Sequence, residues 1–108
     1  MEENYRQQLR KGMLVLAILQ LLSKKEVYVA DMLVALEATE FATQEGTLYP
    51  LLARLKREGL VEHTWVESPA GPPRKYYSLT KAGKDMLAGL NVYTETLKKD
   101  IKQLGGKK

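Results

Sequence analysis

The sequence contains no cysteine and only one histidine, and these absences remove several kinds of site. Without cysteine there can be no disulfide, no thiol nucleophile and no thiolate metal ligand. The lone His63 has no second histidine with which to share a metal ion. We therefore expect it to be a strand-surface residue, and we expect no metal or other cofactor. The lack of cysteine also fits a cytoplasmic protein.

Long hydrophobic runs and catalytic groupings are missing as well. The longest apolar run, Met13 to Leu22, is about half the length that spans a membrane. Because no small-residue cleavage site follows it, we interpret the protein as soluble and cytoplasmic, without a membrane partner. No nucleophile is paired with a base, and there is no glycine-rich phosphate loop. The sequence therefore does not predict an enzyme.

What the sequence does contain is an excess of basic residues. It has 17 Lys and Arg against 13 Asp and Glu, which gives a formal net charge of +4. A basic balance favours anionic partners such as nucleic acid or an anionic membrane surface. The total charge does not choose between them, and the position of the charges in the fold matters more.

Apolar residues at helical spacing predict three helices in the first half of the chain. The first covers about residues 3–22 and a short second one covers residues 28–36. The residues of the second helix that we expect to face inward are Ala30, Leu33 and Val34. Thr43 is the expected N-cap of a third helix, which ends at Gly59. The apolar stripe of this third helix consists of Leu48, Leu51, Leu52 and Leu55.

Two strand-like segments and a long helix follow. Residues 60–67 and 74–79 are typical of a hairpin, and the Ser-Pro-Ala-Gly-Pro-Pro segment between them is rich in turn residues. Thr80 is the expected N-cap of a final helix whose apolar positions repeat almost as heptads. These positions are Met86, Leu90, Tyr93, Leu97, Ile101 and Leu104. The helix is longer than the rest of the domain can cover, and part of this seam therefore needs another partner.

This order of elements predicts a mainly α protein with a small β-hairpin, in the α+β class. The second and third helices form a helix-turn-helix, and the hairpin is a wing beside them. We expect residues 1–79 to be a winged helix-turn-helix DNA-binding domain, 80–104 a C-terminal dimerisation helix and 105–108 a flexible tail. The leucine stripe then anchors the third helix, and its opposite face is free to enter a DNA major groove.

The residues that predict this fold also resemble a known family. The segment EGTLYPLLARLKREGLV, followed by W-x-E-S-x-x-G-P-P-R-K-Y-Y-x-L-T-x-x-G, is similar to the PadR family of transcriptional regulators over residues 45–83. Leu9, Gly12 and Leu19 fit the opening pattern of the family more loosely. The short tail resembles the compact subgroup with a single C-terminal dimerisation helix. One departure is Val27-Tyr28, where the family often has Gly-Tyr at the start of the second helix.

The resemblance implies a homodimer that binds near-palindromic double-stranded operator DNA, usually as a repressor. In the family, the C-terminal helix of one subunit packs against the N-terminal helix of the other. Small aromatic or drug-like molecules release many members from DNA, which makes a small hydrophobic effector a candidate partner. No residue of this sequence identifies that effector. The candidate dimer-interface residues are Leu9, Met13, Leu16, Met86, Leu90, Tyr93, Leu97 and Ile101.

Eight residues are candidates for DNA contact. They are Thr43, Gln44, Thr47, Tyr49, Arg54, Arg57, Arg74 and Lys75. The first four lie in the first turns of the third helix, where side chains can donate hydrogen bonds to phosphates or base edges. The next two lie on its outer face. The last two follow the wing tip, where the resemblance implies contact with the DNA backbone or minor groove. In the plainer interpretation, Thr43 is only a cap, Tyr49 only packs and the cations are solvated.

Two further expectations concern the wing and the class of function. We expect Trp65, the only tryptophan, to pack at the base of the wing. The alternative to a DNA-binding regulator is a winged-helix protein–protein interaction module without operator binding, because an amphipathic last helix could bind another protein. The basic outer face of the third helix favours the regulator. Salt-insensitive binding, or no DNA binding, would favour the interaction module.

Overall fold

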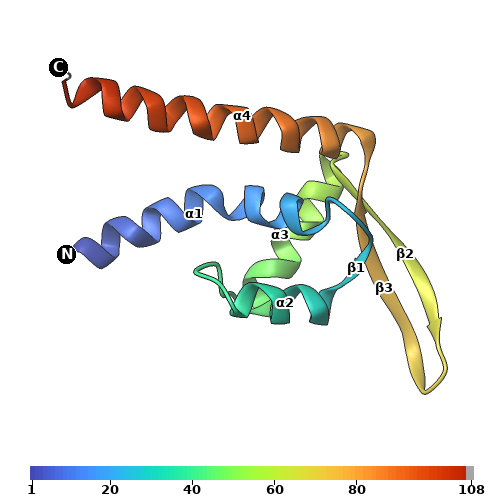
Figure 1. Ribbon diagram of the computed structural model, residues 1–108. Coiled ribbons are helices and arrows are strands. Elements are labelled where there is room, and N and C mark those ends of the chain that lie inside the picture. Colours follow the sequence, from blue (N-terminus) through green and yellow to red (C-terminus); the bar gives the residue numbers. More distant parts are fainter. Residues whose placement is uncertain (107–108) are drawn as a thin grey trace.

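The computed structural model describes residues 1–106, which form four helices and a three-stranded antiparallel sheet (Figure 1). In chain order the elements are α1 (Glu2–Leu21), β1 (Val27–Tyr28), α2 (Val29–Glu37), α3 (Glu45–Arg57), β2 (Val61–Ser68), β3 (Gly71–Leu79) and α4 (Lys81–Leu104). Helices α2 and α3 form a helix-turn-helix, and β2 and β3 form the wing beside it. The predicted α+β class and the winged arrangement are therefore confirmed.

The leucine stripe of α3 anchors this helix in the core, as predicted. Leu48, Leu52 and Leu55 are buried and Leu51 is half-buried. Each buried leucine contributes about 1.5–3 kcal/mol relative to an exposed one. The residues that pack with the stripe in the same cluster include Ile18, Leu19, Met32, Val61 and Leu79. This burial fixes which side of α3 remains in solvent.

The two ends of α3 compare differently with the prediction. The predicted N-cap is wrong by one residue, because the extended residue before the helix is Gln44 and not Thr43. The side chain of Gln44 makes no cap hydrogen bond. Gly59 does end the helix, with a φ of 78°. The N–H of Leu60 then folds back to donate to the carbonyl of Leu55 at 2.9 Å, which completes a Schellman motif.

Helix α2 begins one residue later than predicted and buries a different side. Tyr28 is extended and pairs with Tyr76, and it therefore belongs to β1, a strand that the sequence did not predict. The residues that α2 buries are Val29, Met32 and Leu36. Of the three predicted, Leu33 is half-buried whereas Ala30 and Val34 are exposed. The prediction fails because α2 is apolar on nearly every side, and the pairing of β1 sets which side faces the core.

The wing hairpin is longer than predicted. Strand β3 begins at Gly71 rather than at residue 74, and the turn shortens to Pro69-Ala70. Proline is tolerated in β3 because Pro72 and Pro73 lie opposite the single residue Glu67, at an irregularity in the strand register. A bulged residue makes no ladder hydrogen bond, which is the bond that proline cannot donate.

The start of α4 is fixed against the end of α3. The Thr80 hydroxyl accepts from the N–H of Gly83 at 3.0 Å, which confirms the predicted N-cap, and it donates to the carbonyl of Gly59 at 2.6 Å. Gly83 is buried, and a Cβ at this position would overlap the carbonyl oxygen of Leu60. Leu87, one turn later, is also buried. The first two turns of α4 therefore share the core of the winged domain.

Beyond Leu87, helix α4 runs beside α1, and both extend away from the sheet to the end that holds the two termini (Figure 1). The molecule measures 62 × 33 × 21 Å along its principal axes. Of the predicted tail 105–108, residues 105–106 follow α4, and Lys107 and Lys108 lie outside the described residues. Across residues 1–106, none of the helices combines the length and the apolar character needed to cross a membrane.

Candidate nucleic-acid interface and an apolar groove

The solvent-facing half of α3 divides into three strips. At 3.6 residues per turn, Arg57 lies directly opposite the buried leucines. Thr47 and Arg54 lie on one flank, and Tyr49 and Lys56 lie on the other. All five side chains are exposed. The structure thus places the predicted contact residues of α3 on its solvent side, but it spreads them over the full width of that side.

The flank with Thr47 faces α1. Thr47 and the half-buried Thr43 line a cleft of about 250 Å³ together with residues from the first half of α1. Gln44 is exposed at the start of the helix. Arg54 is paired with Glu58 at 3.2 Å, an exposed pair that contributes little to stability but partly neutralises the arginine. Thr43 and Arg54 are therefore the least available of the predicted contacts on α3.

The other flank of α3 faces the wing. Tyr49 is 44% exposed, and burial of the rest of its ring raises the pKa of its hydroxyl, as does the nearby Glu45 carboxylate. The hydroxyl is therefore protonated at neutral pH and can donate a hydrogen bond. Lys56, seven residues further along the helix, lies on the same flank and is exposed.

His63 of β2 lies on the face of the wing that carries the buried Val61. Burial lowers the pKa of the His63 imidazole, and the charges of Lys75 and Lys56 lower it further. The imidazole is therefore neutral at neutral pH. Its Nδ1 is buried and has no hydrogen-bond partner within residues 1–106. Both lysines lie near this one imidazole, Lys56 on α3 and Lys75 on β3.

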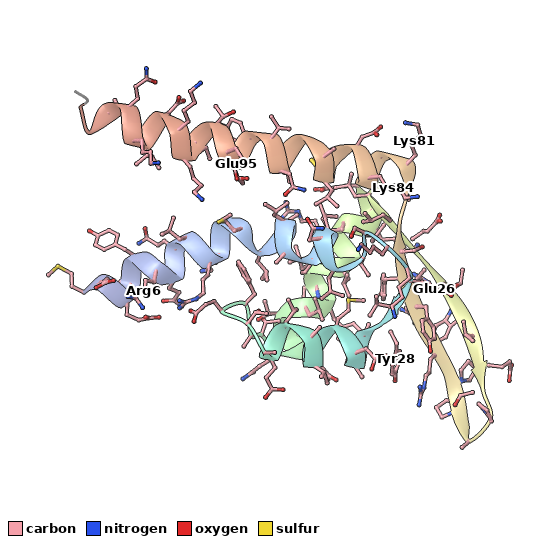
Figure 2. All side chains as sticks on the ribbon, in the orientation of Figure 1. Arg6, Glu26, Tyr28, Lys81, Lys84 and Glu95 are labelled. Carbon is pink, nitrogen blue, oxygen red and sulfur yellow. The ribbon has the colours of Figure 1, made fainter. Side chains whose placement is uncertain are left out.

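The two predicted wing cations each lie above an aromatic ring. The Arg74 guanidinium is 4.8 Å from the ring centre of Tyr28, and the Lys75 ammonium is 5.2 Å from that of Trp65. Figure 2 shows Tyr28 where α2 meets the hairpin. The expected packing of Trp65 at the wing base is wrong, because Trp65 is 64% exposed. Along β2, Val61 is buried and His63 is half-buried, so Trp65 already lies in the part of the hairpin that extends beyond the core.

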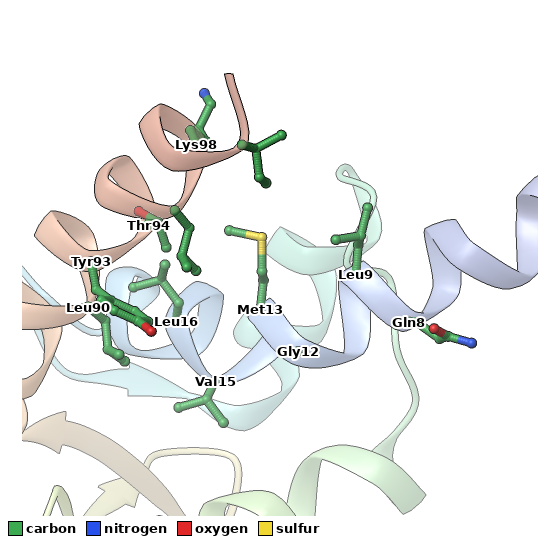
Figure 3. A pocket seen from close by; sticks show the side chains of 12 residues that line it. Gln8, Leu9, Gly12, Met13, Val15, Leu16, Leu90, Tyr93, Thr94 and Lys98 are labelled. Carbon is green, nitrogen blue, oxygen red and sulfur yellow. The ribbon is translucent and has the colours of Figure 1, made fainter. Parts of the chain in front are cut away.

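A groove of about 640 Å³ lies between α1 and the outer part of α4 (Figure 3). Seven of the eight predicted dimer-interface residues line it, namely Leu9, Met13, Leu16, Leu90, Tyr93, Leu97 and Ile101. Leu16 and Leu90 also pack against the core of the same chain, whereas Leu9 and Ile101 are exposed. Met86 is exposed but does not line the groove. The groove is thus an uncovered apolar surface at the opposite end of α1 from the wing.

Three residues near the predicted contacts were missed by the sequence analysis. Lys56 could have been found, because its spacing of seven residues from Tyr49 places both on one side of a helix. Tyr28 and Trp65 could not, because their positions beside the wing cations depend on the strand register. Within the described part of the chain, no three His, Cys, Asp or Glu side chains are grouped in a way that could hold a metal ion.

These features define a winged helix-turn-helix protein with an exposed basic helix, a basic wing and an uncovered helical groove. A family model described as the transcriptional regulator PadR-like family matches residues 18–89. The chain therefore belongs to the PadR-like family of transcriptional regulators, and the resemblance noted in the sequence is confirmed. The family and the similar solved structures are regulators rather than enzymes.

Several solved structures share the fold over almost the whole chain. A PadR-like transcription factor from Bacteroides fragilis is 42% identical, with a TM-score of 0.80 over 94% of this chain and 98% of that chain. A PadR-like transcriptional regulator from Bacillus cereus is 33% identical, with a TM-score of 0.80 over 94% of this chain and 99% of that one. No curated protein sequence matches the chain significantly.

One similar structure includes nucleic acid. PadR from Bacillus subtilis, solved in complex with operator DNA, is 27% identical and has a TM-score of 0.68. The match covers 73% of this chain and 46% of that chain. It therefore concerns a part of the larger protein.

Proposed function

We propose that this protein is a sequence-specific DNA-binding transcriptional regulator that acts as a homodimer. In this proposal it is a cytoplasmic repressor that a small aromatic or drug-like effector releases from DNA. The observation that carries the proposal is that the solvent side of α3 and the wing beside it both carry cations. Helix α3 presents Tyr49 and Arg57, and the wing presents the exposed Arg74 and the half-buried Lys75.

The surface suits duplex DNA because it can reach both the base edges inside a groove and the phosphates beside it. The solvent side of α3 can enter a major groove, which is about 12 Å wide. Gln44, Thr47 and Tyr49 then reach base edges or phosphates from its first turns, and Arg57 reaches a phosphate from its last turn. Lys56 adds a further cation on the wing side. The operator complex of the Bacillus subtilis relative supports this use of the fold.

The shape of the chain supports a homodimer. Its radius of gyration is 16.3 Å, against about 13 Å for a compact chain of this length. The excess comes from α1 and α4, which leave the groove residues Leu9, Leu97 and Ile101 uncovered. The same helices of a second copy would bury them. In this arrangement residues 80–104 form the dimerisation helix, and residues 1–79 bind DNA.

A homodimer fixes the form of the operator. Two copies related by a two-fold axis read two half-sites of opposite direction, and the site is therefore a near-palindrome. The half-sites are separated by about 34 Å or a multiple of it, because both α3 helices must meet the major groove on one side of the duplex.

The groove is also the proposed effector site. Its volume of about 640 Å³ lies in the range of ordinary ligand pockets, about 300–1,000 Å³. Its lining is mostly apolar, with Gln8, Thr94 and Lys98 as polar members. A flat aromatic molecule would contact the apolar walls and hydrogen-bond at the edge. A molecule held between the two copies would change the distance between their α3 helices, which is the basis for release of the repressor.

The test uses a duplex that the wild-type protein selects from a randomised pool. Arg57→Gln is expected to weaken binding and to reduce the slope of log affinity against log salt by about 0.9, because one phosphate contact is lost. Tyr49→Phe removes one hydrogen bond and should weaken binding about three- to tenfold without changing the slope. Fluorescence anisotropy at several salt concentrations measures both quantities.

Lys84→Gln is the matched control, because Lys84 is exposed at the start of α4, away from the wing tip (Figure 2). It should leave both affinity and slope unchanged. If the Arg57 and Tyr49 variants bind as tightly as wild type, α3 does not contact the duplex. The protein-interaction module would be the better account if the wild-type protein itself selected no duplex.

A further inference from the structure

Helix α1 lies between the apolar groove and the cleft at the start of α3. It forms the groove with α4 on one side, and on its other side it faces the turn that precedes α3 (Figure 1). The residues of α1 that line the groove include Leu9, Gly12, Met13 and Leu16. The residues of α1 that line the cleft are Gln7, Arg10, Lys11 and Leu14.

These two sets of residues form the same stripe, displaced by two positions. Each set has the spacing i, i+3, i+5 less one and i+7 of a single helix side, that is i, i+3, i+4 and i+7. Positions two residues apart in an α-helix are separated by about 200°, so the two stripes lie on nearly opposite sides of α1. A sideways movement of α1 that narrows the groove therefore widens the cleft.

The first half of α1 is held loosely by its own chain. Residues 2–9 are all exposed, and Arg10 is the first residue of the helix that is partly shielded from solvent. Gly12 follows shortly after, and glycine weakens a helix. A Cβ at Gly12 would meet nothing within 4 Å, so packing within the chain does not require glycine there. The first half of α1 can therefore move relative to the core, which first buries α1 at Ile18.

Arg10 connects this half of α1 to the turn that precedes α3. Its guanidinium pairs with Glu3, two helical turns back on α1, at 2.6 Å and with Glu40 of the turn at 3.6 Å. The residue after Glu40 is Phe41, which is half-buried and lines the same cleft as Leu14 of α1. An ion pair and an apolar part of the cleft thus join α1 to one short turn.

The position of this turn decides where α3 begins. The Thr39 hydroxyl holds the turn to the end of α2 by donating to the carbonyl of Leu36 at 2.7 Å. The N-cap residue Gln44 makes no side-chain hydrogen bond to the helix. The start of α3 therefore depends on the turn and on α1 rather than on a side-chain cap. Gln44 and Thr47, two candidate DNA contacts, lie at this start, and Thr47 lines the cleft.

We infer that α1 couples the covering of the groove to the position of the start of α3, and that Arg10 and Glu40 are the positioning residues of this coupling. When α4 of a second copy covers the groove, the first half of α1 is fixed on that side. The ion pair then holds the turn, and with it Gln44 and Thr47, in place before DNA binds. Because part of the ordering is complete in the dimer, each of its subunits binds a half-site more tightly than a separate subunit does. This inference rests on the proposed function.

The first experiment measures binding of the selected duplex by Glu40→Gln. If its effect were only electrostatic, removal of a carboxylate near the DNA-binding surface would raise affinity. The coupling predicts the opposite sign, a loss of about two- to fivefold, which is the size of an exposed ion pair. Arg10→Gln should also weaken binding. The double variant should bind no worse than Arg10→Gln alone, because both changes break the same contact.

Glu2→Gln is the matched control for Glu40→Gln. Glu2 pairs with Arg6 within α1 at 2.8 Å and lines neither the groove nor the cleft, so the same charge is removed without touching the turn. It should not weaken binding. Unchanged or tighter binding by Glu40→Gln, or an equal loss in Glu2→Gln, overturns the coupling. The proposed function stands in those cases, since the duplex is still selected and bound.

The second experiment follows amide hydrogen exchange at protein concentrations above and below the dissociation constant of the dimer. In wild type, dimerisation should slow exchange in α1 and α4 and also, by about two- to fivefold, in residues 39–48. In Glu40→Gln it should still slow exchange in the two helices but no longer in residues 39–48. Equal slowing of residues 39–48 in both proteins, or none in wild type, contradicts the coupling. If wild type forms no dimer at any concentration, the proposed homodimer and the coupling both fail.

Discussion

Gly83→Ala is expected to destabilise the protein by about 3 kcal/mol or more, which is at the upper end of overpacking substitutions. The new Cβ would overlap the carbonyl oxygen of Leu60 and lie 3.2 Å from Cδ2 of Leu79. The carbonyl cannot easily move away. It accepts from the N–H of Thr80 at 3.1 Å, and the N–H of Leu60 is bonded to Leu55 in the cap of α3. The substitution therefore separates α4 from the end of α3.

Gly89→Ala is the matched control for this prediction, because Gly89 lies in the same helix and a Cβ there meets nothing within 4 Å. It should stabilise the protein by about 0.5–1 kcal/mol through helix propensity. Urea denaturation of both variants at one fixed protein concentration measures the difference, since the stability of a dimer depends on concentration. Similar midpoints for the two variants would contradict the close packing of Gly83.

Leu97→Glu is expected to raise the dissociation constant of the proposed homodimer by about 100-fold or more. Leu97 is 43% exposed in the single chain and lines the groove, so a second copy would bury a carboxylate in place of a leucine. Losing about 1.5–3 kcal/mol of apolar burial at each of two symmetric positions is sufficient for this change. Binding to the selected duplex should fall as well, because a separated subunit contacts only one half-site.

Val92→Glu provides the comparison for Leu97. Val92 is 68% exposed on α4 and does not line the groove, so its substitution should leave the dimer intact. Sedimentation equilibrium over a range of concentrations gives both dissociation constants, and circular dichroism confirms that each variant is folded. If Leu97→Glu is as dimeric as Val92→Glu, the groove is not the interface between copies.

The parts of the fold that the sequence predicted are those with a strong local pattern. The leucines of α3 recur at helical spacing, Gly59 supplies a positive φ, and Thr80 supplies a cap, and all three features are present in the structure. Each depends on chemistry within a few residues of the chain. The hairpin was found for the same reason, through its turn residues and alternating pattern.

The parts that the sequence missed depend on contacts between distant segments. Strand β1 is two residues long, and only its pairing with β3 makes it a strand. On α4 the heptad-like seam gave Met86 as an apolar contact, but Leu87 is the residue buried against the winged domain. The seam faces the open groove, and a neighbouring side of the helix faces the core. A one-dimensional repeat does not separate two adjacent faces of one helix.

For the candidate DNA contacts too, the local spacing was predictable from the sequence and the contacts between distant segments were not. Sequence spacing placed Arg54 and Arg57 on the outer face of α3, and both side chains are exposed in the structure. The pairing of Arg54 with Glu58 follows from their spacing of four residues on one helix, and it competes with the proposed phosphate contact of Arg54. The supports of Arg74 and Lys75 needed the strand register, which only the folded chain provides.

The most direct test of the central claim is selection of bound duplexes from a randomised pool by the purified full-length protein, followed by titration of the best duplex against salt. We expect enrichment of a near-palindrome whose half-sites are one or more helical turns apart, with affinity that falls steeply as salt rises. A folded dimer that enriches no sequence, or that binds without salt dependence, would contradict the regulator and favour an interaction module for proteins.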